Sequence, residues 1–381
     1  MEFGWTEEEQ RYRDAVIAFA QRELGEDLIR RDAEGVFSRE AWLKCARFGI
    51  HGLLIPKAYG GQGADPLRLV LAMEALGYGC KDNGLLFSIS AQLCSCVIPL
   101  VKFGTEAQKR RYLPGLSNGA LMAGHAMTEA ESGSDAFSLA TTAERVGDRF
   151  RLDGKKVFVC NGPVADVFVV FASTNPRKRF AGISVFLVDR STPGVLVGEP
   201  LNKMGLRTGL ASEVVFAGCE IPAENLLGKP GGGTAIFNSS MEWERSLILA
   251  SAVGGMARQL DRCIDYAKRR KQFGQAIGKF QAVSHRIADM KVRLETARLV
   301  LYQVGWLKRE GKSAALESAI TKLYLSECYV QSGLDAMQIH GGLGYKVEAE
   351  LEREVRDAIG SRIYSGTSEI QKNLIANRLG L

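Results

Sequence analysis

Apolar residues recur at helical spacing in the first and last parts of the chain. Near the start, Val16, Phe19 and Ala20 form an apolar face. They follow Thr6 and Glu9, which have the spacing of a capping box that starts a helix. Near the end, apolar residues recur at alternating steps of four and three, at Val283, Ile287, Met290, Leu294, Ala297, Leu301 and Val304. This spacing is typical of a helix that packs in a bundle.

Two further long helices are predicted in the last third of the chain. The stretch from Ile236 to Arg270 contains no proline, and as a single helix it would be about 50 Å long at ~1.5 Å per residue. Another helical pattern runs from about Leu316 to Met337 and ends at Gly341 and Gly342. The last part of the chain is therefore expected to be a helical bundle.

The pattern between about residues 121 and 230 is that of strands. Residues 149–159 read as two short strands joined by an Asp153–Gly154 turn. Apolar, β-branched runs at 167–171, 183–188 and 214–216 predict further strands. We therefore predict an α+β protein with an N-terminal α-helical domain (1–120), a central antiparallel β domain (121–230) and a C-terminal helical domain (231–381).

Composition narrows the class of protein. Hydrophobic residues make up 46% and charged residues 24% of the 381 residues, which is typical of a globular protein. No apolar run approaches the ~18–20 residues of a membrane span. The first residues have neither the basic start nor the apolar stretch of a secretory signal, so a cytoplasmic protein without a membrane partner is expected.

Cysteine and histidine spacing argues against disulfides and metal. The eight cysteines include no CxxC, and the four histidines include no HxxxH pair. We expect reduced cysteines and no metal site.

The net charge of +6 leaves the partner open. Basic residues cluster at 109–111, 177–179 and 268–271, and solvated surface is the usual explanation of such runs. No nucleic-acid motif accompanies them. An acidic partner or a phosphate-bearing ligand is compatible with this charge. The glycines at 231–233 are interpreted as a flexible joint before a helix, with anion binding as the alternative.

Four motifs carry a more specific signal. They are MTEAESGSD at 127–135, KVFVCNG at 156–162, RRKQFG at 269–274 and YSGTSEIQ at 364–371, together with PKAYGG at 56–61 and KMGLR at 203–207. In this order, over about residues 5–381, they make the chain resemble the acyl-CoA dehydrogenase family of flavoproteins. The resemblance implies an α–β–α fold with a C-terminal four-helix bundle, the cofactor FAD, and a homotetramer built as a dimer of dimers.

Two other segments resemble one branch of that family. Residues 88–100 and 239–244 look like those of enzymes that oxidise prolyl groups tethered to an acyl or peptidyl carrier protein. The resemblance implies α,β-dehydrogenation of a prolyl thioester to a pyrroline or pyrrole thioester, with a flavoprotein or O2 as electron acceptor. The alternatives are an acyl-CoA dehydrogenase for a short or branched acyl-CoA, and a non-catalytic scaffold that lacks flavin.

The resemblance also implies a catalytic base. Many family members place a glutamate where this chain has Ser365, and a serine cannot act as a general base at neutral pH. Another group places it on the first long helix of the C-terminal domain, immediately before an arginine, which matches Glu244 and Arg245. Glu244 is therefore the predicted base, and an ordinary solvent-facing glutamate is the alternative. Glu242 would point about 200° away around a helix.

The remaining site residues follow from the same resemblance. Ser134 and Arg245 are expected to contact substrate. A thiol at Cys160 replaces the usual hydroxyl near flavin N5 and is a weaker donor. Arg270, Phe273 and Gln281 are expected to reach the FAD of a neighbouring subunit. The full set of predicted cofactor contacts is Met127, Thr128, Gly133, Ser134, Phe158, Cys160, Arg270, Phe273, Gln281, Gln338, Gly342 and Thr367.

Overall fold

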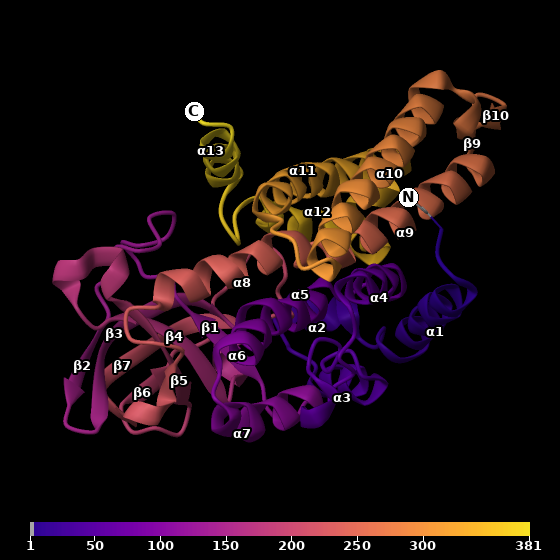
Figure 1. Cartoon of the computed structure of the whole chain (residues 1–381). Helices are drawn as coiled ribbons and strands as arrows, with labels where there is room; N and C mark the ends of the chain where they lie inside the picture. The colour runs from indigo at the N-terminus through magenta and orange to yellow at the C-terminus, as the bar shows by residue number, and fades with distance from the viewer. Residues whose placement is uncertain (1–3) are drawn as a thin grey trace.

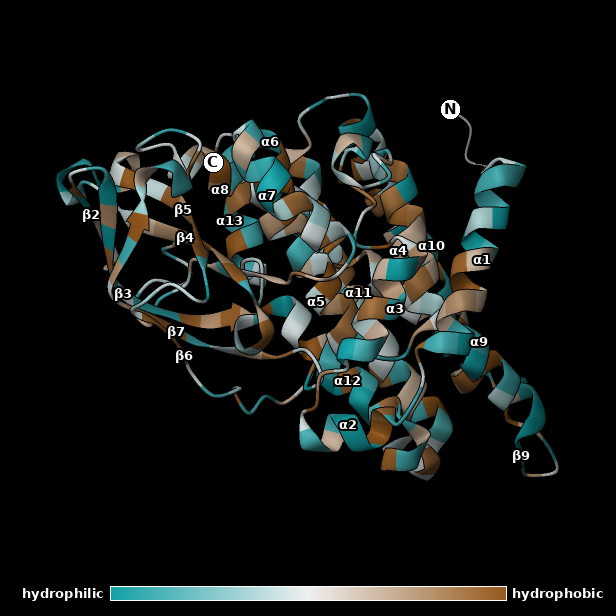
Figure 2. Cartoon of the chain, turned by 90° about the horizontal axis from the view of Figure 1, so that it is seen from below, coloured by the Kyte–Doolittle hydropathy of each residue, from teal (hydrophilic) through white to brown (hydrophobic). Residues whose placement is uncertain are grey.

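The computed structural model describes residues 4–381. Figure 1 shows the strands of the large sheet gathered at one end of the molecule, with helix α8 lying along them, and a short two-stranded sheet at the other end. Figure 2 shows hydrophobic residues, in brown, where α4, α5 and α11 meet, and hydrophilic residues, in teal, at outlying segments such as the start of α1. The main core is therefore shared by the N-terminal and C-terminal helices.

The N-terminal part is helical, as predicted. Its elements are α1 (Glu7–Glu23), α2 (Leu28–Glu34), α3 (Arg39–Phe48), η1 (Lys57–Tyr59), α4 (Pro66–Gly79), α5 (Asn83–Ala91), the π-helical turn η2 (Gln92–Val97), α6 (Ile98–Phe103) and α7 (Glu106–Ser117). The capping box is confirmed: Glu9 N donates to Thr6 Oγ1 at 3.2 Å, and Thr6 N donates to the Glu9 carboxylate at 2.8 Å.

The stretch Asn83–Phe103 corrects the expectation about apolar runs. It is long and apolar enough to cross a membrane by length and composition alone, with a mean hydropathy of 1.9. Small polar residues such as Ser88 and Ser90 lie between its apolar residues, so the stretch contains no long unbroken apolar run. Because 89% of the tested window is buried inside the protein, it is a core helix of this fold.

The central part is a mixed sheet. Its strands are β1 (Ala123–Ala126), β2 (Thr142–Val146), β3 (Arg149–Cys160), β4 (Val167–Ser173), β5 (Ile183–Asp189), β6 (Val195–Val197), β7 (Ala211–Pro222) and β8 (Leu226–Leu227). The order is β6-β7-β3-β2-β4-β5-β8, with β1 also paired to β4. The pairs along this order are antiparallel as expected, except that β2 and β1 both run parallel to β4.

The hairpin predicted at Asp153–Gly154 is wrong. Both residues lie inside the continuous strand β3, and the β2–β3 turn comes earlier, at Gly147 and Asp148. The register between β3 and β7 shifts beside Gly154. A Cβ on Gly154 would lie 2.4 Å from Thr141 Oγ1, so this glycine permits a close approach instead of a turn.

The C-terminal part is again helical. Its elements are α8 (Gly233–Leu247), α9 (Ala250–Arg269), the short strands β9 (Lys271–Gln272) and β10 (Gln275–Ala276), α10 (Gln281–Arg309), α11 (Ala315–His340), α12 (Leu351–Ile359) and α13 (Ser368–Arg378). The apolar stripe on α10 is confirmed, because Met290, Leu294 and Leu301 are buried. The single helix predicted over 236–270 is instead two helices, separated at Ile248 and Leu249.

Two of the three glycines at 231–233, where α8 begins, pack closely against β5. Gly231 N donates to Ser184 Oγ at 2.9 Å, and a Cβ on Gly233 would lie 2.7 Å from Ile183. The interpretation as a flexible joint is therefore replaced by close packing, which only a residue without a side chain allows.

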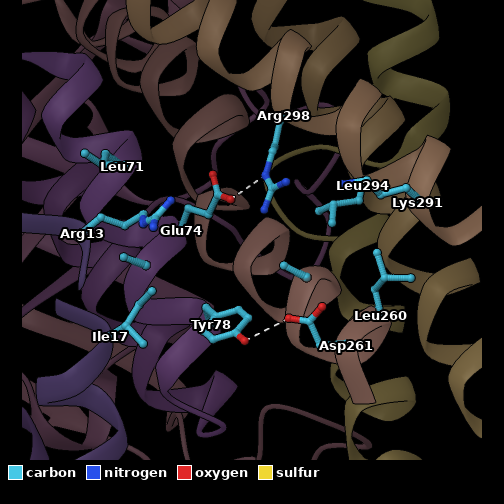
Figure 3. Close-up of a pocket in the computed structure, with 12 residues that line it drawn as sticks. Arg13, Ile17, Leu71, Glu74, Tyr78, Leu260, Asp261, Lys291, Leu294 and Arg298 are labelled. Atoms are coloured by element: carbon cyan, nitrogen blue, oxygen red, sulfur yellow. Dashed lines mark hydrogen bonds and ion pairs between the residues drawn. The ribbon is translucent and has the colours of Figure 1, made fainter. Parts of the chain in front are cut away.

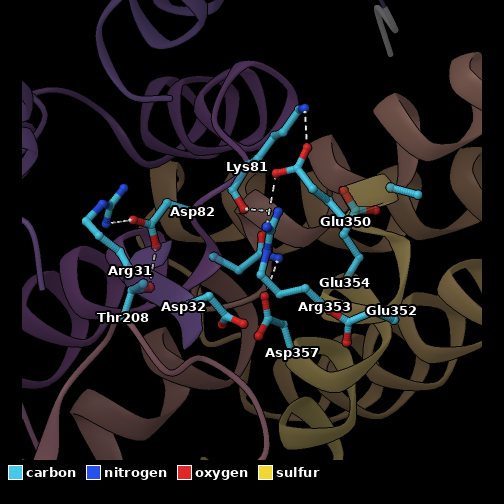
Figure 4. A network of polar contacts seen from close by, with 12 residues as sticks. Arg31, Asp32, Lys81, Asp82, Thr208, Glu350, Glu352, Arg353, Glu354 and Asp357 are labelled. Atoms are coloured by element: carbon cyan, nitrogen blue, oxygen red, sulfur yellow. Dashed lines mark hydrogen bonds and ion pairs between the residues drawn. The ribbon is translucent and has the colours of Figure 1, made fainter. Parts of the chain in front are cut away.

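A polar network joins the three parts of the chain (Figure 4). Asp82, at the start of α5, accepts hydrogen bonds from Arg31 at 2.6 Å and from Thr208. Asp357, on α12, accepts from Asn83 Nδ2 at 2.9 Å and from Leu206 N at 2.6 Å. Each carboxylate is buried, so the network fixes the sheet and α12 relative to the N-terminal helices.

We predict that Asp357 makes stability depend on pH. Burial raises its pKa from the ordinary value to about 6. The unfolded chain has a pKa near 4, so between about pH 4 and 6 the folded state retains a proton that the unfolded chain releases. This contribution to stability is present below pH 4 and is lost as the pH rises through 6. The Asp357→Asn variant has no such proton to lose. The difference in free energy of unfolding between this variant and wild type should therefore shift by about 1–2 kcal/mol in favour of the variant as the pH rises from 4.5 to 7.5. Urea unfolding at both pH values measures this, and a pH-independent difference would contradict it.

Candidate active site

Glu244 lies on α8 with its carboxylate inside the protein. The residue is 8% exposed. Its Oε1 accepts a hydrogen bond from Ser365 Oγ at 2.5 Å, and its Oε2 accepts one from Ser95 Oγ. The alternative of a solvent-facing glutamate is therefore wrong. A buried carboxylate with one hydroxyl donor on each oxygen is held in a defined orientation.

The two serines come from opposite parts of the chain. Ser95 lies in the π-helical turn η2, a kind of turn that often occurs at functional sites. Ser365 has φ of +56°, which is uncommon for a residue with a side chain. Gln371 Nε2 donates to Ser365 O at 3.2 Å and to Gly366 O at 3.0 Å, and this fixes the loop before α13.

The contact between residues 244 and 365 explains the two alternative positions of the base. Glu244 and Ser365 are far apart in sequence, yet their side-chain oxygens lie 2.5 Å apart. A glutamate at either position would place its carboxylate in the same neighbourhood. Glu242 points elsewhere, as helical geometry predicts, and binds Lys308 and the backbone N of Ala314 at 2.8 Å.

Several thiols, a histidine and a tyrosine near Glu244 are uncharged at pH 7. Burial, with the Glu244 charge as a second cause, raises the pKa of Cys160 to about 12 and holds the thiols of Cys94 and Cys96 well above their usual range. Burial also lowers the pKa of His125 and raises that of Tyr364. Thiols that stay protonated are poor nucleophiles.

Several predicted cofactor residues lie together at the end of β1 and along β3. Met127 is buried, and Thr128 O accepts a hydrogen bond from Val157 N at 2.8 Å. Phe158 is 67% exposed and has φ of +54°, so its ring is turned outward from the sheet. Cys160 ends the strand. An exposed aromatic ring in an unusual backbone conformation suits a planar ligand stacked on it.

The loop after β1 faces solvent at Gly133 and Ser134, two of the predicted cofactor contacts. Gly133 and Ser134 are exposed, and an added Cβ on Gly133 would meet no atom within 4 Å. Thr367 caps α13 by accepting a hydrogen bond from Ile370 N at 3.3 Å, and it follows the Ser365–Gly366 turn beside Glu244. Arg245, next to Glu244, has a buried Nε without a hydrogen-bond partner among residues 4–381.

A second group of predicted residues lies at the other end of the molecule. Arg270 and Phe273 belong to the tip formed by α9, β9 and β10, far from the sheet in Figure 1. Phe273 is 93% exposed and has φ of +50°. Gln281 begins α10, Gln338 lies on the last turn of α11, and Gly342 follows that helix. The structure therefore divides the predicted cofactor residues into two separate groups.

The sequence analysis missed the buried ion pair between Glu129 and Lys156. The two charged groups are 2.7 Å apart, and Lys156 also donates to Met127 O at 3.1 Å. Glu129 accepts from Ala140 N and Thr141 N as well. Phe150 and Leu152 point inward on β3, so alternation along a strand places Lys156 inward too, and this signal could have revealed it.

A pocket of about 330 Å³ lies between α1, α4, α9 and α10 (Figure 3). Two polar contacts join its lining residues: Arg298 pairs with Glu74 at 2.7 Å, and Tyr78 donates to Asp261 at 2.9 Å. The predicted site residues are not among those that line it. We therefore assign it no role in the chemistry. Within residues 4–381, no group of three His, Cys, Asp or Glu side chains could hold a metal ion.

Comparisons with known proteins cover the whole chain. Family models described as the N-terminal, middle and C-terminal domains of acyl-CoA dehydrogenase match residues 6–120, 124–219 and 231–380. An L-prolyl-[peptidyl-carrier protein] dehydrogenase from a Serratia species is 43% identical over 381 residues, which covers 100% of this chain and 99% of that protein.

Solved structures agree with this similarity. The crystal structure of the prolyl acyl carrier protein oxidase AnaB superposes with a TM-score of 0.98 at 50% identity, covering 99% of this chain and 100% of that one. PigA with FAD and proline superposes with a TM-score of 0.97 at 43% identity, covering 100% of both chains.

We predict that the Glu129–Lys156 pair stabilises the loop between β1 and β2. Replacing Lys156 by Met leaves the Glu129 carboxylate buried without its cation, and should lower the free energy of unfolding by about 3–5 kcal/mol. Adding Glu129→Gln should recover part of that loss. The neighbouring Lys155, which pairs with Glu213 on the surface, is the matched control, and Lys155→Met should cost less than about 1 kcal/mol. Equal losses in urea unfolding for both lysine variants would contradict the prediction.

Proposed function

The chain belongs to the acyl-CoA dehydrogenase family, and on that premise we propose that it uses FAD to dehydrogenate a prolyl thioester on an acyl or peptidyl carrier protein. One observation carries the proposal. The two segments that resemble the prolyl-oxidising branch, 88–100 and 239–244, touch each other through Ser95 and Glu244. Full-length relatives at 43% and 50% identity, named for prolyl carrier proteins, support this substrate class.

Glu244 supplies the base in this proposal. The thioester carbonyl makes the α C–H acidic, and Glu244 removes that proton. FAD, when bound, accepts the hydride from the β carbon. The substrate loses two hydrogens in one round to give a pyrroline thioester, and four in two rounds to give a pyrrole thioester. The hydroxyls of Ser95 and Ser365 keep the carboxylate oriented towards the reacting carbon.

The residues beside Glu244 fit a flavin. Phe158 offers an exposed ring on which the flavin would stack, and Cys160 lies two residues further along the same strand. Met127 and Thr128 would border the ring system, while Gly133 and Ser134 would face the phosphates. Ser134 and Arg245 are also proposed to contact substrate. The Nε of Arg245 is buried and has no hydrogen-bond partner among residues 4–381, so its N–H is free to donate to a substrate.

The second group of cofactor residues requires another copy of the chain. Arg270, Phe273 and Gln281 would reach the FAD of a partner, where the Arg270 guanidinium suits the pyrophosphate. Gln338 and Gly342 would lie along the adenosine part. Val292 and Leu299, one heptad apart on α10, are 62% and 52% exposed, and a partner subunit would cover them. We therefore propose a homotetramer built as a dimer of dimers.

The alternative function is dehydrogenation of a short or branched acyl-CoA, which the family name favours. Mass spectrometry separates the two. The protein is incubated in parallel with a prolyl-loaded carrier protein and with a panel of acyl-CoAs, and losses of two or four hydrogens are recorded. Losses from the carrier substrate support the proposal, and losses only from acyl-CoAs would overturn it. The electron acceptor, a flavoprotein or O2, and the cytoplasmic location stay predictions.

Replacing Glu244 by Gln should abolish the reaction while the protein keeps its flavin. The amide has nearly the same shape but cannot accept the α proton, so flavin reduction by the prolyl carrier should slow by about 10²–10⁴-fold. Anaerobic stopped-flow absorbance at the flavin band measures this. A near-normal rate of flavin reduction in a flavin-loaded Glu244→Gln variant would show that Glu244 is not the base.

Replacing Ser95 by Ala should slow flavin reduction by roughly 10–100-fold, because the Glu244 carboxylate loses one of the two donors that hold it in position to remove the proton. The acid limb of the pH–rate profile should also move to higher pH, since a hydroxyl donor stabilises a carboxylate. Ser95→Thr should restore both. Ser246→Ala is the matched control, because this buried hydroxyl on α8 donates to Glu242 O and Trp243 O and not to Glu244. A rate loss without a shifted pH profile would reduce Ser95 to a packing role.

A further inference from the structure

The loop between β4 and β5 carries a cluster of free positive charge. Arg177, Lys178 and Arg179 lie in the short helical segment η4 (Pro176–Gly182), and all three side chains are exposed. No Asp or Glu among residues 4–381 forms an ion pair with them. Phe180, the next residue, is 60% exposed. The loop therefore presents three unneutralised cations beside an aromatic ring.

The basic run on α7 differs in its pairing. Lys109 and Arg110 pair with Glu106, and Arg111 pairs with Asp189. Their positive charge is therefore largely balanced by nearby carboxylates. The run at 268–271 lies at the opposite tip of the molecule and contains Arg270, which the proposed function already uses for a partner's cofactor. The β4–β5 loop is the basic cluster that the proposed function leaves unexplained.

The loop is fastened to the start of α8. Thr174 N donates to Gly182 O at 2.8 Å and closes the base of the loop. Thr234 Oγ1, on the first turn of α8, donates to Phe180 O at 2.6 Å. A Cβ on Gly231 would lie 2.7 Å from Ala181 O, so the backbones approach closely there. The cations are thus held at the N-terminal end of the helix that carries Glu244.

Helix α8 leads from this loop into the interior. Ala235 and Asn238 are exposed, whereas Ser240, Met241 and Glu244 are buried. Glu244 is ten residues beyond Thr234, or about 15 Å along the helix axis. That separation is of the order of an extended phosphopantetheine arm. A carrier protein at the loop could therefore deliver its thioester to Glu244 along α8.

A further cation lies beside this path. Lys102 donates to Ser239 Oγ at 3.2 Å and lies over the Trp243 ring, 5.4 Å from its centroid. It forms no ion pair with a described carboxylate. Lys102 therefore adds one positive charge beside the middle of α8.

We propose that Arg177, Lys178 and Arg179, with Phe180 beside them, form the docking surface for the carrier protein. The inference rests on the proposed function, which requires a carrier-bound substrate. The phosphodiester that attaches the arm is an anion, and carrier proteins are typically acidic around the serine that bears it. Opposite charges steer such partners together and fix their orientation. The ring of Phe180 supplies apolar contact next to the charges.

The test compares a loop variant with a matched control. The loop variant is Arg177→Gln, Lys178→Gln and Arg179→Gln combined. The control removes the same charge from α7 by Lys109→Gln, Arg110→Gln and Arg111→Gln. Each flavin-loaded enzyme is assayed with a prolyl-loaded carrier protein, with prolyl-CoA, which has phosphate groups but no protein, and with prolyl-pantetheine, which has the thioester but neither the phosphodiester nor the protein. Melting temperatures verify that both variants are folded.

The loop variant should raise KM for the carrier substrate by about tenfold or more, because steering charges act mainly on encounter. Its kcat/KM for prolyl-pantetheine should stay within about twofold of wild type. Added salt should raise KM for the carrier substrate with wild type and the control, and much less with the loop variant. The control should behave like wild type with both substrates.

Other outcomes overturn the inference in distinguishable ways. An unchanged KM for the carrier substrate would show that the loop is not the docking surface. Equal losses with prolyl-pantetheine would show that the loop acts on the site itself. An equal rise in KM for prolyl-CoA would mean that the loop recognises phosphate groups and not the carrier protein. If wild type does not turn over the prolyl carrier at all, the proposed function fails, and the docking surface fails with it.

Discussion

The contact of the Glu244 carboxylate with Ser95 and Ser365 is the interaction on which the candidate site depends. A carboxylate away from water needs donors, and here each oxygen has one hydroxyl. Those hydroxyls come from the N-terminal core helix and from the loop before the last helix. The π-helical turn around Ser95 and the left-handed backbone of Ser365 are both local departures from regular structure. Unusual backbone of this kind persists only where the surrounding packing requires it.

Burial keeps several titratable groups near that carboxylate uncharged. The same burial that keeps the thiols of Cys94, Cys96 and Cys160 protonated also keeps His125 uncharged. The buried Glu129–Lys156 pair acts on the adjoining loop, where it ties Met127 to β3. Further away, Asp82 and Asp357 hold the sheet and α12 against the N-terminal helices. The site is therefore positioned by buried polar contacts between parts of the chain that are distant in sequence.

The predicted cofactor residues form two groups that lie at opposite ends of the molecule. Met127, Phe158 and Thr367 lie towards Glu244, whereas Arg270 and Phe273 lie at the far tip of the C-terminal helices. Residues that are this far apart in one copy can meet only if a second copy contributes one of the groups. Cofactor binding and assembly would then be thermodynamically linked, since a ligand that bridges two subunits stabilises their association.

The sequence by itself determined the features that depend on short-range pattern. The capping box at Thr6, the apolar stripe of α10 and the strands β4 and β5 all follow from spacing within a few turns or residues. The family resemblance, with Ser365 at the alternative position, led to the prediction of Glu244 as the base. Tertiary structure decided what depends on distant neighbours. Gly154 permits the close approach of Thr141 and forms no turn. The apolar stretch Asn83–Phe103 is a core helix, because the protein buries it. The helices α8 and α9 are separated at Leu249. Ser95 looks ordinary in sequence, because Glu244 on α8 comes near it only when the chain has folded. Alternation along β3 turns Lys156 inward, but only the folded chain brings its partner Glu129 beside it.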